Sequence, residues 1–156
     1  MISRIPRLLV VEDYADDERL IKRALQRMGY DMDVEYVHDG EEAVERLCGS
    51  GSALPLPDLM LLDWKMPKMM GAEVLREVRS SPHCKGLVIV AFSSSDGEQD
   101  KLQCAALGGN AYVVKPIAYQ PFLAAVQGII TKFGPGNRKK AVSRVAVVQL
   151  SDAHQA

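Results

Sequence analysis

The chain has 156 residues, of which 47% are hydrophobic and 25% charged, and its formal net charge is −1. This length fits one domain with a full-sized core plus a short appendage, and the near-neutral charge argues against a dedicated nucleic-acid binder. The three cysteines form no CxxC pair, which favours reduced thiols in the cytoplasm. No apolar run is long enough for a signal peptide or a membrane span, so we expect a cytoplasmic protein without membrane contact.

Strand-like and helical patterns alternate along most of the chain. Short apolar runs bounded by polar residues, Gly or Pro predict strands, and apolar residues at helical spacing predict helices between them. The predicted strands are 7–11, 34–37, 58–63, 87–92 and 111–114, and the predicted helices are 16–28, 39–47, 72–79, 96–107 and 119–133. This alternation predicts a doubly wound α/β domain over residues 1–133, with a five-stranded parallel sheet and helices on both faces.

Residues 134–156 have a different composition. The stretch GPGNRKK is typical of a linker, and residues 144–150 (RVAVVQL) then predict an extra strand. Such a segment is either a frayed terminus or a strand that pairs with its own sheet or with another chain. Because its apolar side chains are costly to leave in water, we favour pairing and expect a homodimer.

Polar functional groups stand where four of the five predicted strands end. Glu12 and Asp13 follow the first strand, Asp63 ends the third, Ser93 follows the fourth and Lys115 follows the fifth. All strands of a parallel sheet end on the same edge, so these groups should meet in the crevice where open α/β sheets bind ligands. Taken alone, Asp63 is explained by a cap on the following loop. The polar groups at the other strand ends favour a functional role for Asp63.

The predicted crevice has the chemistry for phosphoryl transfer. Crowded carboxylates repel one another, and a hard divalent cation such as Mg²⁺ relieves that repulsion while keeping waters and substrate oxygens as further ligands. A carboxylate beside such a cation is suited to attack phosphorus, and an ammonium and a hydroxyl would stabilise the phosphoryl oxygens. We therefore predict that Asp63 is a nucleophile that carries a phosphoryl group, with Mg²⁺ as the cofactor.

The motifs VVED, LLDWKMP, AFSSS and AYVVKP, in this order, resemble a two-component response-regulator receiver domain over residues 6–133. The resemblance implies a flavodoxin-like (βα)5 fold with strand order 2-1-3-4-5. It also implies that Asp63 accepts a phosphoryl group from a phosphohistidine of a sensor histidine kinase. The acidic start of the first helix and the loop GSGSALPLP resemble stand-alone, chemotaxis-receiver-like regulators of the phytochrome-associated subgroup, which implies a bacteriophytochrome as the kinase.

The same resemblance assigns the metal ligands. Asp13 and Asp63 would bind Mg²⁺ directly, Glu12 would act through a water, and the backbone carbonyl of Lys65 would be a further ligand. Many members of the family have Asn or another small polar residue where this chain has Lys65. Its side chain is expected near the phosphoryl group, where it would alter the access of water and hence the lifetime of the phosphorylated form.

The resemblance also assigns a switch. Ser93 would be the switch hydroxyl, Tyr112 the switch aromatic and Lys115 the partner of the phosphate, and the peptide bond between Lys115 and Pro116 would be cis. For Tyr112 a half-buried strand aromatic remains the alternative. The neighbouring Ser94 and Ser95 are explained as loop hydroxyls or an N-cap of the next helix. Trp64 and residues 66–70 either form a docking surface or fill space around the site.

Two functions of different classes remain. The first is a signalling switch, not an enzyme, in which phosphorylation of Asp63 repacks the face formed by the fourth helix, fifth strand and fifth helix. The tail is too short for a helix-turn-helix unit, so we expect output by protein–protein contact or phosphate relay. The second is a Mg²⁺-dependent phosphohydrolase with Asp63 as nucleophile. Hydrolases of the haloacid-dehalogenase type have a second acid two residues after the nucleophile, and Lys65 in that position argues against it.

Overall fold

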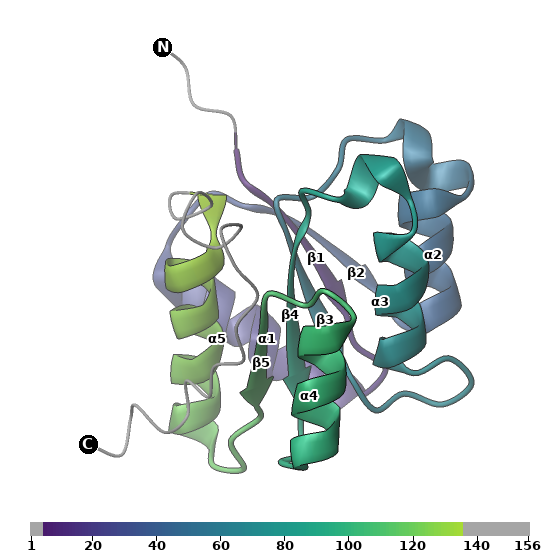
Figure 1. Ribbon diagram of the computed structural model, residues 1–156. Helices are drawn as coiled ribbons and strands as arrows, with labels where there is room; N and C mark the ends of the chain where they lie inside the picture. The colour runs from purple at the N-terminus through teal and green to yellow at the C-terminus, as the bar shows by residue number, and fades with distance from the viewer. Residues whose placement is uncertain (1–4, 136–156) are drawn as a thin grey trace.

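A five-stranded parallel sheet forms the centre of the structure, a computed structural model that describes residues 5–135 (Figure 1). Its strand order, β2-β1-β3-β4-β5, is the predicted one, and all four strand pairs are parallel. The strands are β1 (Arg7–Val11), β2 (Asp33–Val37), β3 (Leu59–Asp63), β4 (Val88–Ser93) and β5 (Ala111–Val114). The predicted fold class is therefore confirmed, and β3 lies at the centre of the sheet.

Helices cover both faces of this sheet (Figure 1). One core cluster joins the sheet to α1 and α5, and the other joins it to α2, α3 and α4. The helices are α1 (Ala15–Met28), α2 (Gly40–Cys48), α3 (Gly71–Arg79), α4 (Glu98–Ala106) and α5 (Tyr119–Phe133), and two 3₁₀ turns, η1 (Ser50–Ala53) and η2 (Pro82–Cys84), were not predicted.

The residues of β3 are buried on both faces, which explains the unbroken apolar run in the sequence. Leu59 and Leu61 pack in the α1–α5 cluster, and Met60 and Leu62 in the opposite one. Fully burying an apolar side chain of this size stabilises the fold by about 1.5–3 kcal/mol. The strand is thereby fixed between the two helical layers, and Asp63 at its end has little freedom to shift.

Local signals fix most of the helix ends, with α4 as the exception. The Asp39 side chain accepts a hydrogen bond from the Glu42 amide at 2.8 Å and caps α2. The helix α4 begins at Glu98 rather than at residue 96. The Ser95 hydroxyl accepts a hydrogen bond from the Gly97 amide at 3.2 Å and holds this stretch as a turn instead. The N-cap of α4 is Gly97, so the alternative that Ser95 caps it was wrong.

The prediction of a cis bond between Lys115 and Pro116 is wrong. No peptide bond between residues 5 and 135 is cis. The trans isomer is intrinsically favoured before proline by about 0.5–1 kcal/mol. The Lys115 amide donates to the Ser93 carbonyl at 2.7 Å and extends the pairing of β4 with β5 by one residue.

The described chain ends shortly after α5, whose last residue is Phe133. The predicted tail strand, residues 144–150, lies outside the described residues. Within the described part of the chain, no helix has the length and apolar character needed to cross a membrane.

The start of α3 packs closely on the end of β3, and an alanine at Gly71 tests this contact. A Cβ there would lie 2.8 Å from the Asp63 carbonyl oxygen and 2.8 Å from the Cα of Trp64, both backbone atoms. We expect Gly71→Ala to lower the free energy of unfolding by about 1–3 kcal/mol, as overpacking does, in urea unfolding. Gly86→Ala is the matched control, because nothing lies within 4 Å of its Cβ position. Equal stabilities of the two variants would contradict this account.

Candidate functional site

Three carboxylates meet at the carboxyl edge of the sheet. Val11 at the end of β1 lies opposite Leu62 of β3, so Glu12 follows at the level of Asp63. Glu12, Asp13 and Asp63 each contribute an oxygen, and these oxygens all lie within 4.8 Å of one another. Glu12 and Asp63 are buried, whereas Asp13 is exposed. The cluster is therefore enclosed by protein at Glu12 and Asp63 and open to solvent at Asp13. This arrangement suits a hard divalent cation that keeps water ligands.

Burial controls the charge state of this cluster. It raises the pKa of Asp63 to about 9, with a further contribution from the charge of Glu12, while the charge of Lys115 opposes the shift. Burial also raises the pKa of Glu12 against the attraction of Lys115. Burial thus shifts both acids toward their protonated forms, and a divalent cation would compete with protons for the carboxylates.

The ammonium of Lys115 lies among three acids. Its Nζ is 2.8 Å from Asp17 Oδ2, 3.0 Å from Glu12 Oε1 and 3.5 Å from Asp63 Oδ1. Burial alone would lower the pKa of Lys115, but the charges of Asp63 and Glu12 outweigh it and raise the pKa. The lysine therefore stays charged, and it offsets part of the repulsion among the carboxylates.

Sequence reasoning did not assign Asp17 to the site. An acid in the first turn of a helix is explained by the helix dipole alone, yet the Asp17 side chain is only 20% exposed and forms the shortest of the contacts with Lys115. A signal was present, because Asp17 lies in the first turn of α1, only four residues beyond Asp13.

Ser93 and Tyr112 are linked through the loop that follows β4. Both residues are fully buried. The Ser93 hydroxyl accepts a hydrogen bond from the Ser95 amide at 3.1 Å, and the Tyr112 hydroxyl donates to the Ser95 carbonyl at 2.8 Å. The Tyr112 ring packs edge-on against Trp64, with centroids 6.0 Å apart. Trp64 and Met66 are themselves buried, so they fill space beside the site.

Lys65 turns toward α4. Its Nζ lies 3.2 Å from Asp100 Oδ2, and the same carboxylate accepts a hydrogen bond from the Ser95 hydroxyl at 2.6 Å. Neither contact was predicted, because each joins residues from separate loops and helices. The predicted role of the Lys65 carbonyl as a metal ligand stays a prediction.

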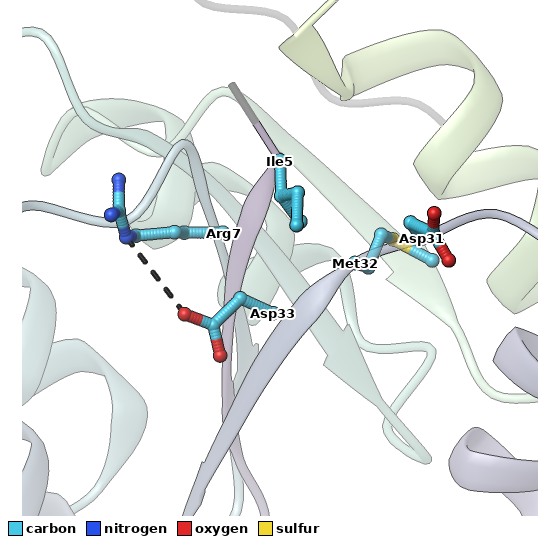
Figure 2. A pocket seen from close by; sticks show the side chains of 5 residues that line it. All are labelled: Ile5, Arg7, Asp31, Met32 and Asp33. Carbon is cyan, nitrogen blue, oxygen red and sulfur yellow. Dashed lines mark ion pairs between the residues drawn. The ribbon is translucent and has the colours of Figure 1, made fainter. Parts of the chain in front are cut away.

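A hollow of about 500 Å³ lies at the opposite edge of the sheet and is lined by Ile5, Arg7, Asp31, Met32 and Asp33 (Figure 2). Arg7 Nε reaches to 3.9 Å from Asp33 Oδ2, as the dashed line in Figure 2 shows. The amino ends of β1 and β2 form this region, whereas open α/β sheets bind ligands at the carboxyl ends. We therefore place the functional site at the acid cluster.

Comparison with known proteins gives one family. The pattern described as "Response regulator receiver domain" matches residues 8–127. The chemotaxis protein CheY1 of Helicobacter pylori (strain ATCC 700392 / 26695) is 33% identical over 114 residues, which are 73% of this chain and 88% of that protein.

Two solved structures have the same fold over most of their length. The phosphorylated cyanobacterial phytochrome response regulator RcpA is 33% identical, with a TM-score of 0.79 over 85% of this chain and 99% of that one. The Mn²⁺-bound form of response regulator Rcp1 is 32% identical, with a TM-score of 0.75 over 81% of this chain and 92% of that one. The response regulator Rcp1 of Synechocystis sp. (strain ATCC 27184 / PCC 6803 / Kazusa) is 33% identical over 124 residues, which are 78% of this chain and 84% of that protein.

The raised pKa of Asp63 makes stability depend on pH. A carboxyl with a folded-state pKa near 9 binds more protons in the folded than in the unfolded state, so stability falls as pH rises above about 4. In chelator, we expect Asp63→Asn to raise the free energy of unfolding by about 1–3 kcal/mol at about pH 8, and by less toward pH 4.

Urea unfolding over this pH range measures the effect. Asp31→Asn is the control, because Asp31 is an exposed acid at the other edge of the sheet. We expect that variant to match the wild type within about 0.5 kcal/mol. A gain for Asp63→Asn that does not grow with pH would contradict the raised pKa.

Proposed function

Because this chain belongs to the response regulator receiver domain family of two-component signalling, we propose that it is a single-domain response regulator and that Asp63 is its phosphoacceptor. Members of the family accept phosphate from histidine kinases and are not generally classed as enzymes. The observation that carries the proposal is the position of Asp63, buried at a strand end between an acid pair and a buried ammonium. In the transfer, a carboxylate oxygen of Asp63 bonds to phosphorus while the bond from phosphorus to the kinase histidine nitrogen breaks.

The acid cluster is proposed to hold Mg²⁺. Asp13 and Asp63 would be direct ligands, with Glu12 acting through a water and Lys65 contributing its backbone carbonyl. When bound, the cation would neutralise charge on the phosphoryl oxygens. The grouping of three carboxylates supports this, as does the Mn²⁺-bound form of the relative Rcp1.

Lys115 and Ser93 are proposed to bind the phosphoryl oxygens. The ammonium of Lys115 already lies 3.5 Å from Asp63, so a small change of partners brings it onto a phosphoryl oxygen. The hydroxyl of Ser93 would donate to another, which pulls on the loop that also binds the Tyr112 hydroxyl. Phosphorylation thereby biases the position of Tyr112 and of the surface around it.

The output of this switch is proposed to be protein–protein contact or phosphate relay, without a nucleic-acid or membrane partner. Large apolar side chains are exposed on α4, on the β5–α5 loop and on α5, with Leu102 at 66%, Ile117 fully exposed and Tyr119 at 42%. Exposed apolar groups of this kind mark interaction sites when they gather on one face.

The kinase partner is proposed to be a bacteriophytochrome, on the strength of the similarity to the phytochrome response regulator RcpA. We place the chain in the cytoplasm, where a kinase has access to ATP. The alternative of a phosphohydrolase is not favoured, because Lys65 stands where such enzymes have a second acid.

Phosphorylation by a small phosphoryl donor tests the function. With acetyl phosphate and Mg²⁺ we expect a labile acyl phosphate on the wild type, observed by intact mass, and its loss in chelator or in Asp63→Asn. Asp31→Asn is the control and should be labelled like the wild type, because Asp31 lies at the far edge of the sheet. Failure to form the acyl phosphate, or rapid multiple turnover of a phosphoester, would overturn the proposal.

The homodimer proposal rests on residues 144–150 and is tested by truncation after Phe133, the last residue of α5. We expect the full chain to have the mass of a dimer in light scattering and the truncated chain that of a monomer, because the apolar segment is removed. Circular dichroism and urea unfolding should show that the truncated chain folds. An unchanged mass on truncation would count against a dimer held by the tail.

A further inference from the structure

Asp100, in the first turn of α4, is the common partner of two loops. From the β3–α3 loop, Lys65 Nζ lies 3.2 Å from Oδ2 and 3.5 Å from Oδ1. From the β4–α4 loop, the Ser95 hydroxyl donates to Oδ2 at 2.6 Å. The Asp100 side chain is only 17% exposed, whereas that of Lys65 is 47% exposed. The acid is thus the more enclosed member of the pair, and the lysine is the more exposed one.

The contacts of the Asp100 carboxylate favour its charged form. Burial works to raise its pKa, but hydrogen bonds from Ser95 and Lys65 outweigh that effect and lower the pKa. Charge-assisted hydrogen bonds to a carboxylate are stronger than neutral ones. Asp100 therefore keeps a negative charge at the start of α4, where it holds the Lys65 ammonium.

The Lys65 ammonium has a competing site. Lys65 follows Asp63 by two residues, and its long stem has several rotatable bonds. Glu12 and Asp63 are buried, whereas Lys65 is exposed in the loop that follows β3, two residues beyond Asp63. A phosphoryl group on Asp63 would attract this ammonium, and Asp100 is the partner that retains it.

We propose that Asp100 is a positioning residue that holds the Lys65 side chain on α4 and away from Asp63, and thereby sets how fast water removes the phosphoryl group. This inference rests on the proposed phosphorylation of Asp63. In the hydrolysis a water oxygen bonds to phosphorus, the bond from phosphorus to the Asp63 oxygen breaks, and the water proton leaves to solvent. An ammonium lying over the phosphoryl group obstructs that water, so release of Lys65 slows the step.

Asp100 also fixes the loop that contacts both proposed switch residues. Asp100 binds the Ser95 hydroxyl. The Ser95 carbonyl accepts a hydrogen bond from the Tyr112 hydroxyl, and the Ser95 amide donates one to the Ser93 hydroxyl. Loss of Asp100 should therefore loosen residues 95–97 even without phosphorylation. This loosening of the loop is expected whether or not Asp63 carries a phosphoryl group.

A double-mutant cycle tests whether Asp100 acts through Lys65. The wild type, Asp100→Asn, Lys65→Met and the double variant are phosphorylated with acetyl phosphate and Mg²⁺, the donor is removed, and decay of the acyl phosphate is followed by intact mass. We expect Asp100→Asn to slow the decay about two- to tenfold, the size of coupling found between contacting residues. The double variant should decay like Lys65→Met. No change, or the same change in both backgrounds, would overturn the proposal.

Glu98→Gln is the matched control on the same turn of α4. Glu98 Oε1 lies 3.5 Å from Lys101 Nζ and forms no ion pair with Lys65 among the described residues. We expect it to decay like the wild type, and a slowing equal to that of Asp100→Asn would overturn the proposal by assigning the effect to charge alone. Urea unfolding checks that each variant folds.

Hydrogen exchange separates this inference from the proposed function. We expect faster amide exchange at residues 95–97 in unphosphorylated Asp100→Asn than in the wild type, with Glu98→Gln unchanged. If the wild type forms no acyl phosphate, the proposed function fails while exchange still reports on Asp100. Unchanged exchange in Asp100→Asn would overturn the positioning role, whatever the chemistry at Asp63.

Discussion

The site depends on one buried cation, Lys115, among carboxylates that the sheet forces together. Glu12 and Asp63 come from adjacent parallel strands, so neither can move away without breaking the register of the sheet. Their mutual repulsion is relieved by protonation, by a metal or by the ammonium, and only the ammonium is part of the chain. Removing one partner of a buried ion pair typically costs about 3–5 kcal/mol, because the other charge is left without compensation. The end of β5, which carries the lysine, is thus tied to the ends of β1 and β3.

This constraint explains why the fold and the site were predictable together. The strands read as apolar runs because both faces of the sheet are covered, and four of them end in functional groups because strand ends of a parallel sheet share an edge. The strand order needed more than periodicity. It came from the resemblance carried by the motifs around Asp13, Asp63, Ser93 and Lys115, and the structure confirms it.

The parts that sequence reasoning missed are contacts between residues that neither periodicity nor motif spacing brings together. A helix start alone explains an acid such as Asp17, and its contact with Lys115 depends on where the start of α1 lies relative to the end of β5. The start of α4 was placed too early because Ser95 replaces the first helical hydrogen bonds with its own side-chain contacts. The cis bond was taken from the resemblance alone. Local patterns identify elements, but side chains at their junctions are decided by packing.

The two lysines near Asp63 differ in how deeply they are buried and in how many acids they contact. The Lys115 side chain is 8% exposed and has three acids within reach, so it stays charged inside the site and would need only a small shift to meet the proposed phosphoryl group. Lys65 is 47% exposed with Asp100 as its carboxylate partner, and an exposed pair of this kind is worth about 0–1 kcal/mol. A pair that weak is poor support for the fold, yet it exchanges partners readily. Such a pair is suited to control the approach to Asp63, because a small change in charge nearby redistributes the ammonium between α4 and the site.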